Sequence, residues 1–195
     1  MPDGGPGGPV STATAREPSM LAVGTIVWLA SELMFFGGLF AAYFTLRSMS
    51  AEWPPSNIEL ETLPSLLNTI VLIISSGTMI LGVRALERGD RAGLQRWTVI
   101  TLALGAVFVA EQLREFATLN FGVSTNAYGS IFWLLTGFHA AHVTAGLVLL
   151  GIAAALARSP SPLERHAPAV DAVSYYWHFV DVVWIAVFIT IFVIR

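Results

Sequence analysis

Apolar residues dominate five long stretches of the chain, and short polar segments separate them. A helix needs about 20 apolar residues to cross the hydrocarbon core of a bilayer, and each stretch is long enough to do so. The pattern therefore predicts an all-α membrane protein, a bundle of five transmembrane helices. The predicted spans are residues 20–46, 65–86, 97–119, 128–157 and 170–194.

The composition supports the same class of protein. Hydrophobic residues make up 55% of the chain and charged residues 12%, with a mean hydropathy of +0.69. A soluble domain carries about 25% charged residues. The connectors are too short for a soluble domain, so we expect a disordered Gly/Pro-rich tail (1–18) followed by one transmembrane domain (19–195). Without cysteine, the chain has no disulfide, thiolate metal site or cysteine nucleophile.

The placement of arginine predicts the orientation of the bundle in the membrane. Basic residues accumulate in cytoplasmic connectors. Seven arginines flank the first span or lie near the second and fourth connectors, on one predicted side: Arg16, Arg84, Arg88, Arg91, Arg96, Arg158 and Arg165. The opposite side carries fewer arginines and several glutamates. We therefore expect a cytoplasmic N-terminus and a C-terminus outside.

We single out seven ionisable residues within the predicted spans, because a charge facing lipid at the bilayer centre would cost about 2.5–3.5 kcal/mol. We therefore expect these side chains to face the bundle interior or one another. Glu32 lies near the midplane of the first span. The other six form a predicted intramembrane polar cluster: His139, His142, His178, Asp181, Glu111 and Glu115.

Helical spacing groups some of these residues. His139 and His142 share one face of their helix, and so do His178 and Asp181. A metal or haem site is one interpretation, and a hydrogen-bonded cluster that fixes helix register is the other. The histidine pair lacks a nearby carboxylate of the kind strong metal motifs contain, so we predict no metal-binding, cofactor-binding or catalytic residue. A separate row of small residues on the fourth span predicts close helix packing: Gly137, Ala141 and Ala145.

The remaining carboxylates have two interpretations each. Glu32 is either a proton-exchanging group, reactive toward hydrophobic carbodiimides, or a neutral acid that donates one helix-to-helix hydrogen bond. Glu111, Arg114 and Glu115 form either an ion pair within one helix or part of a proton relay.

Several motifs resemble those of the cytochrome c oxidase subunit III family, in the same order along the chain. Short ones are WPP (53–55), LLNT (66–69), GDR (89–91) and QLREF (112–116). The longer ones are ASELMFFGG (30–38), YGSIFWLLTGFHAAHV (128–143) and YYWHFVDVVW (175–184). The chain is similar to the shorter bacterial form, which has five spans and lacks the two N-terminal spans of the seven-helix form.

The resemblance implies an accessory subunit of an aa3-type cytochrome c oxidase in the bacterial plasma membrane. Such an enzyme reduces O2 to water with electrons from cytochrome c, or from a cytochrome c-containing complex, and pumps protons. Haem a, haem a3 and copper are expected in the partner subunits I and II, and none in this chain. The family subunit packs on subunit I, binds phospholipids, supports proton uptake and protects the enzyme from turnover inactivation. Glu32 matches the family's carbodiimide-reactive glutamate. No nucleic-acid partner is expected.

Two related functions remain as alternatives. Quinol oxidases contain an equivalent subunit, and nitric oxide reductases can carry a related accessory protein. Glu32 favours the cytochrome c type, because a quinol-type subunit has aspartate at that position. From other classes, a membrane transporter or a haem-binding electron carrier would also have several spans, but no internal repeat is visible.

Overall fold

The computed structural model describes residues 20–56, 58 and 60–194, and the predicted N-terminal tail (1–18) lies outside them. Five of the described helices are long and apolar enough to cross a membrane, as the hydropathy pattern predicts. The elements are α1 (Met20–Met49), α2 (Thr62–Glu87), α3 (Arg91–Thr118), α4 (Ala127–Arg158), α5 (Leu163–Phe188) and the short π-helix η1 (Ile189–Val193).

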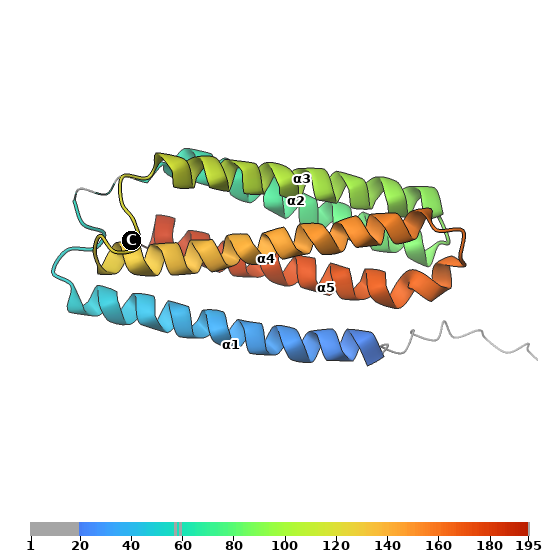
Figure 1. Cartoon of the computed structure of the whole chain (residues 1–195), viewed down its shortest axis with the longest axis horizontal. Coiled ribbons are helices and arrows are strands. Elements are labelled where there is room, and N and C mark those ends of the chain that lie inside the picture. The colour runs from blue at the N-terminus through green and yellow to red at the C-terminus, as the bar shows by residue number, and fades with distance from the viewer. Residues whose placement is uncertain (1–19, 57, 59, 195) are drawn as a thin grey trace, which may run out of the picture.

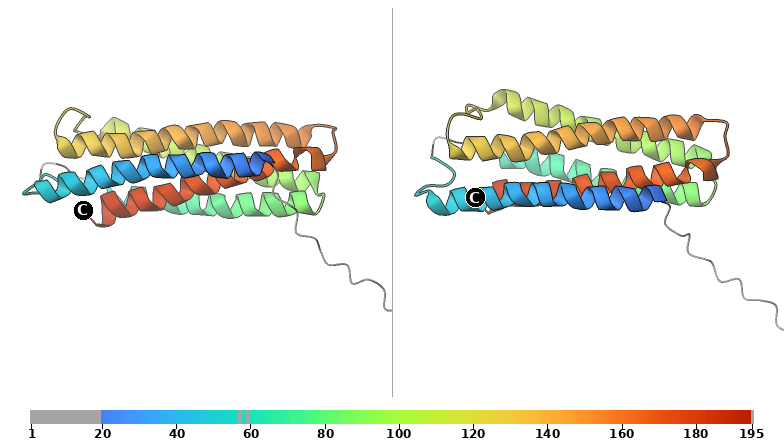
Figure 2. Two further views of the ribbon diagram at one scale, coloured as in Figure 1. Left: turned by 90° about the horizontal axis from the view of Figure 1, so that it is seen from below. Right: turned by 60° about the horizontal axis from the view of Figure 1, so that its bottom comes forward.

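The helices run up and down in chain order, so the start of α1 and the end of the chain lie at opposite ends of the bundle (Figure 1). The helices α2, α3, α4 and α5 pack around one another, and α1 packs against α4 and α5 on the side away from α3 (Figure 1). Two further views show α1 running along α4 and α5 over most of its length (Figure 2). The bundle is therefore a four-helix core with one helix added to its outer face.

Helix α1 contacts the core along a single narrow stripe. Its buried residues are Ala22, Leu29, Phe36 and Tyr43, one in every seven. A spacing of seven returns to nearly the same side of a helix, as in a coiled-coil seam. At the end of this stripe the Tyr43 hydroxyl donates to the backbone oxygen of Thr190 in η1 (3.1 Å). Most of the circumference of α1 is consequently left exposed.

The centre of the bundle is organised by two tryptophans of α5. The indole Nε1 of Trp177 donates to Ser75 Oγ (3.0 Å), and that of Trp184 donates to Thr69 Oγ1 (2.9 Å), both on α2. The ring of Trp177 also fills space left by glycines: a Cβ at Gly105 of α3 would lie 2.5 Å from it, and a Cβ at Gly146 of α4 2.9 Å. Trp177 therefore ties together four helices at one level.

The GDR motif forms the turn between α2 and α3 and joins it to α4. Gly89 adopts a positive φ of 70°, which favours glycine. Asp90 caps α3, because its Oδ1 accepts a hydrogen bond from Gly93 N (2.9 Å). The guanidinium of Arg91 donates to the backbone oxygens of Ala157 (3.2 Å) and Ser159 at the end of α4, whose carbonyls lack helical partners. The motif thus fixes three helix ends at once.

The connector between α1 and α2 is held by aromatic packing. The ring of Trp53 lies edge-on to Tyr43 of α1 and Tyr128 of α4, with centroid distances of 5.3 and 5.0 Å. The peptide bond between Trp53 and Pro54 is cis. The WPP motif therefore joins the connector to the first and fourth helices.

Two sequence predictions differ from the fold. The third and fifth spans were predicted to begin at residues 97 and 170, but α3 begins at Arg91 and α5 at Leu163, with Pro168 inside α5. Hydropathy marks only the apolar part of a helix, whereas capping and polar first turns extend it. The predicted close packing along Gly137, Ala141 and Ala145 is wrong within the described bundle, because Ala141 and Ala145 are exposed and a Cβ at Gly137 would meet nothing within 4 Å.

Candidate functional site

The polar contact of greatest chemical interest joins α1 to α4 inside the spans. Glu32 Oε2 lies 3.2 Å from His142 Nε2, and the two side chains are 23% and 17% exposed. Phe36 packs edge-on against the His142 ring, at a centroid distance of 5.1 Å. The helix-to-helix contact that the second interpretation of Glu32 requires is therefore present.

The other nitrogen of His142 limits where protons can be. His142 Nδ1 lies 2.7 Å from the backbone oxygen of Phe138, which can only accept, so Nδ1 must carry a hydrogen. In a neutral ring Nε2 is then an acceptor, and Glu32 must be the protonated donor. If Glu32 is ionised instead, a hydrogen bond requires both nitrogens of His142 to be protonated, and the contact is an ion pair. Either way the contact holds one transferable proton and no net charge.

His139 occupies a different environment from His142, although the two are three residues apart. Its ring is fully buried, stacked on Trp184 at a centroid distance of 4.8 Å and edge-on to Phe108 at 5.9 Å. Within the described part of the chain neither of its ring nitrogens has a hydrogen-bond partner. Positions three apart differ by about 60° around a helix, and here that rotation points one ring at α3 and α5 and the other at α1.

His178 and Asp181 of α5 meet at Ser76 of α2. The Ser76 hydroxyl donates to Asp181 Oδ2, and its oxygen lies 2.8 Å from His178 Nδ1. Because the single hydroxyl hydrogen goes to Asp181, the Ser76 oxygen accepts from His178 Nδ1–H. The serine thus stands between the acid and the histidine, whereas in a hydrolase triad the histidine stands between the acid and the nucleophile. The arrangement joins two helices and provides no activated nucleophile.

The two glutamates of α3, Glu111 and Glu115, also have different partners. Arg114 Nε lies 2.6 Å from Glu111 Oε2, and both side chains are about half exposed (48% and 46%). Glu115 instead accepts hydrogen bonds from Ser65 Oγ and Gln112 Nε2, both at 3.3 Å. The ion pair predicted within this helix is therefore formed by Glu111 and Arg114, and it does not include Glu115.

The residues predicted as one polar cluster thus do not lie together in one place. Sequence reasoning missed Ser76 as the group that joins His178 and Asp181, and no local signal could have identified it because α2 and α5 are about a hundred residues apart. Among the residues that the structure describes, no three His, Asp or Glu side chains come together in a way that could hold a metal.

Comparison with known proteins agrees with the motifs and the fold. A family model described as cytochrome c oxidase subunit III matches residues 11–194. A probable cytochrome c oxidase subunit 3 of Mycobacterium leprae is 50% identical over 184 residues, which cover 92% of this chain and 91% of the relative. One from Nocardia farcinica is 46% identical over 198 residues, covering 97% and 98%. The cytochrome c oxidase subunit 3 of Thermostichus vulcanus is 40% identical over 184 residues, covering 92% and 90%.

Matches of this length and identity leave no large part of the described bundle outside the family pattern, and they confirm the resemblance seen in the motifs. The chain therefore belongs to the cytochrome c oxidase subunit III family, as a multi-pass membrane subunit of an oxidoreductase complex in the bacterial plasma membrane.

Proposed function

We propose that this chain is the accessory subunit of an aa3-type cytochrome c oxidase that reduces O2 with electrons from cytochrome c and pumps protons. Haem a, haem a3 and copper belong to subunits I and II in this proposal, and this chain packs on subunit I. The observation that carries the proposal is family membership over residues 11–194 together with the Glu32–His142 contact between two spans. The chain then supports the redox subunits by binding lipid, assisting proton uptake and limiting inactivation during turnover.

The ends of the bundle support a cytoplasmic N-terminus. The turns α2–α3 and α4–α5 lie at the same end as the start of α1 (Figure 1). These turns and the adjoining helix ends bring together Arg84, Arg88, Arg91, Arg158 and Arg165. Basic residues near short connectors are retained on the cytoplasmic side, so this end is proposed to face the cytoplasm.

Glu32 is proposed as the proton-exchanging and carbodiimide-reactive group. A carbodiimide reacts with a protonated carboxyl, and one of the two proton arrangements with His142 supplies that form. Glu32 is partly exposed on α1, beside the exposed side chains of Leu33 and Met34. A hydrophobic reagent dissolved in the lipid could therefore reach it without entering the core.

The exposed side of α1 is proposed to contact phospholipid. Eleven large apolar side chains of α1 are exposed, and its buried stripe faces only α4 and α5. Apolar side chains on a spanning helix are stable against acyl chains. Lipid covering α1 would also surround Glu32 and keep bulk water from its contact with His142.

The proposal is tested by isolating the complex through a tag on this chain in mild detergent. We expect haem a absorbance and a copper-containing subunit II in the isolated complex; a quinol oxidase without that copper would contradict the assignment. In a strain lacking this chain, the oxidase should turn over at first and then lose activity faster than the complete enzyme. Complete loss of haem on removing the chain would instead show that the chain is needed to hold the cofactor.

A further inference from the structure

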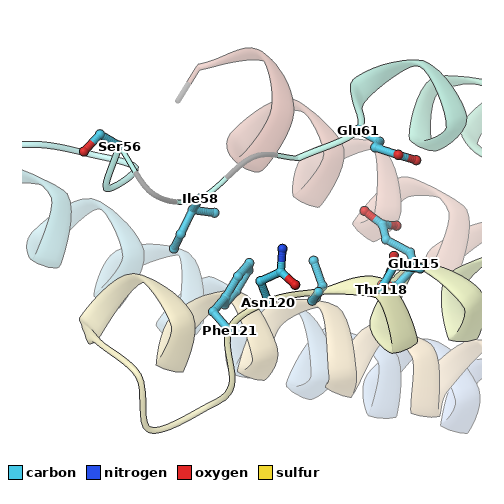
Figure 3. Close-up of a pocket in the computed structure, with 8 residues that line it drawn as sticks. Ser56, Ile58, Glu61, Glu115, Thr118, Asn120 and Phe121 are labelled. Atoms are coloured by element: carbon cyan, nitrogen blue, oxygen red, sulfur yellow. The ribbon is translucent and has the colours of Figure 1, made fainter.

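A polar cavity lies at the end of the bundle opposite the arginine-rich turns. It has a volume of about 300 Å³ and is formed by the α1–α2 connector, the end of α3 and the α3–α4 connector. Glu61 and Glu115 contribute carboxylates to it, and Asn120 contributes an amide (Figure 3). Figure 3 shows the two carboxylates at the same end of the cavity, one from the residue that precedes α2 and one from α3.

A second, much smaller cavity adjoins the first at Glu115. Its volume is about 10 Å³, and its polar lining comes from Ser65 and Asn68 of α2 and from Glu111, Arg114 and Glu115 of α3. A cavity of this size accommodates about one water molecule or one ion of similar size. Glu115 lines both cavities, so a group bound beside it would face both.

Asn68 provides an independent indication that this small cavity has an occupant. The side chain is only 6% exposed, and its Nδ2 donates to the backbone oxygen of Phe108 (3.1 Å). Because a carbonyl oxygen only accepts, the amide orientation is fixed and Oδ1 is the remaining atom. Across residues 20–56, 58 and 60–194, Asn68 Oδ1 has no hydrogen-bond partner. A buried oxygen left without a partner costs about 1–3 kcal/mol, which a bound cation would offset.

The charges around the two cavities do not balance. Glu111 is paired with Arg114 at 2.6 Å, which neutralises both. Glu61 acts electrostatically on Arg114 and Glu115, but neither Glu61 nor Glu115 forms an ion pair with any residue in the described part of the chain. Arg114 also acts electrostatically on Glu115, so this one guanidinium faces three glutamates, and an excess of formal negative charge remains beside an unpaired amide oxygen.

We propose that a divalent cation of the calcium type binds at Glu115, where the two cavities meet. Asn68 Oδ1 and Ser65 Oγ contribute neutral oxygens from α2, and Glu61 supplies the second negative charge from the connector side. All of these donors are oxygens, which hard cations such as Ca²⁺ prefer, and Ca²⁺ completes its shell of six to eight oxygens with water. The bound ion would join the α1–α2 connector to α2 and α3.

The test measures Mn²⁺ binding, because Mn²⁺ replaces Ca²⁺ at oxygen sites and free Mn²⁺ is quantified by its electron paramagnetic resonance signal. The complex is isolated through a tag on this chain, depleted with a chelator and titrated with Mn²⁺. Glu61→Gln removes one charge at an exposed residue outside the helices, so folding should be unaffected. We expect Glu61→Gln to weaken the binding of one Mn²⁺ per complex at least tenfold. We expect Glu115→Gln to have the same effect. Subtracting variant from unmodified complex removes the contribution of other cation sites.

A matched control is available at the other end of the bundle. Glu87 and Glu164 line a cavity of about 320 Å³ there, but none of its lining residues has a side-chain amide. Glu164→Gln should leave Mn²⁺ binding unchanged. Equal Mn²⁺ binding by the unmodified complex, Glu61→Gln and Glu115→Gln would overturn the proposal and assign the small cavity to a water molecule. A loss confined to Glu164→Gln would overturn it as well.

Discussion

Replacing Gly105 by alanine tests whether Trp177 fixes the packing of the core. A Cβ at this position would lie 2.5 Å from Trp177 Cη2 and 2.8 Å from Leu147 Cδ2. Carbon atoms pack at about 3.5–4.0 Å, so the indole would have to move by about 1 Å. It has little room to do so, because Gly146 approaches another edge of the ring and Ser75 accepts a hydrogen bond from its Nε1 at 3.0 Å.

The magnitude follows from two opposing effects. Overpacking of this kind costs about 1–3 kcal/mol. Replacing glycine by alanine in a helix contributes about 1 kcal/mol in the opposite direction. Gly137→Ala and Gly151→Ala on α4 gain the same helix propensity without a clash, since a Cβ at either position meets nothing within 4 Å. The expected difference in unfolding free energy between Gly105→Ala and these controls is therefore about 1–3 kcal/mol.

The assay is thermal unfolding of the purified chain in one detergent, with all three variants measured side by side. Gly105→Ala should unfold several degrees below both controls, at about 2–4 °C per kcal/mol for a chain of this size. Equal midpoints for all three variants would refute the role of Trp177. Lower stability of Gly137→Ala than of Gly105→Ala would instead restore the close packing predicted from the small-residue row.

Three further substitutions test the polar contacts. Asp181→Leu should reduce assembly of the complex more than its activity per haem, because the Ser76 hydroxyl loses its hydrogen-bond acceptor at about 1–3 kcal/mol; normal assembly would contradict this role. Arg91→Gln should lower the thermal midpoint of the purified chain, because three backbone oxygens near the end of α4 lose a charged donor worth about 1.5–3 kcal/mol, and an unchanged midpoint would reject that role. Glu32→Ala should leave initial O2 reduction largely intact and abolish carbodiimide labelling of this chain, as read by mass spectrometry. Persistent labelling would assign the reactive carboxyl to another residue.

The sequence by itself determined the class of protein, the number of spans and the family. Each of these depends on properties local to a segment: about 20 apolar residues predict a span wherever they occur, and motifs such as HAAH and WHFVD are contiguous. It also determined that the ionisable residues within the spans need partners, because an uncompensated charge in lipid is too costly. The predicted positions of the helix ends were less accurate, because hydropathy does not detect a capping residue such as Asp90.

Only the tertiary structure decided which partner each polar residue has. His142 meets Glu32 on a helix 110 positions away, while Ser76 meets His178 across 102 positions. Such contacts depend on how far each helix is rotated about its axis and on which helices are its neighbours, and hydropathy constrains neither. For the same reason, the close packing predicted along the row at Gly137 is instead found at Gly105 and Gly146, which face Trp177. A small residue marks where a backbone can come close, but the large side chain on the opposite helix decides where it does.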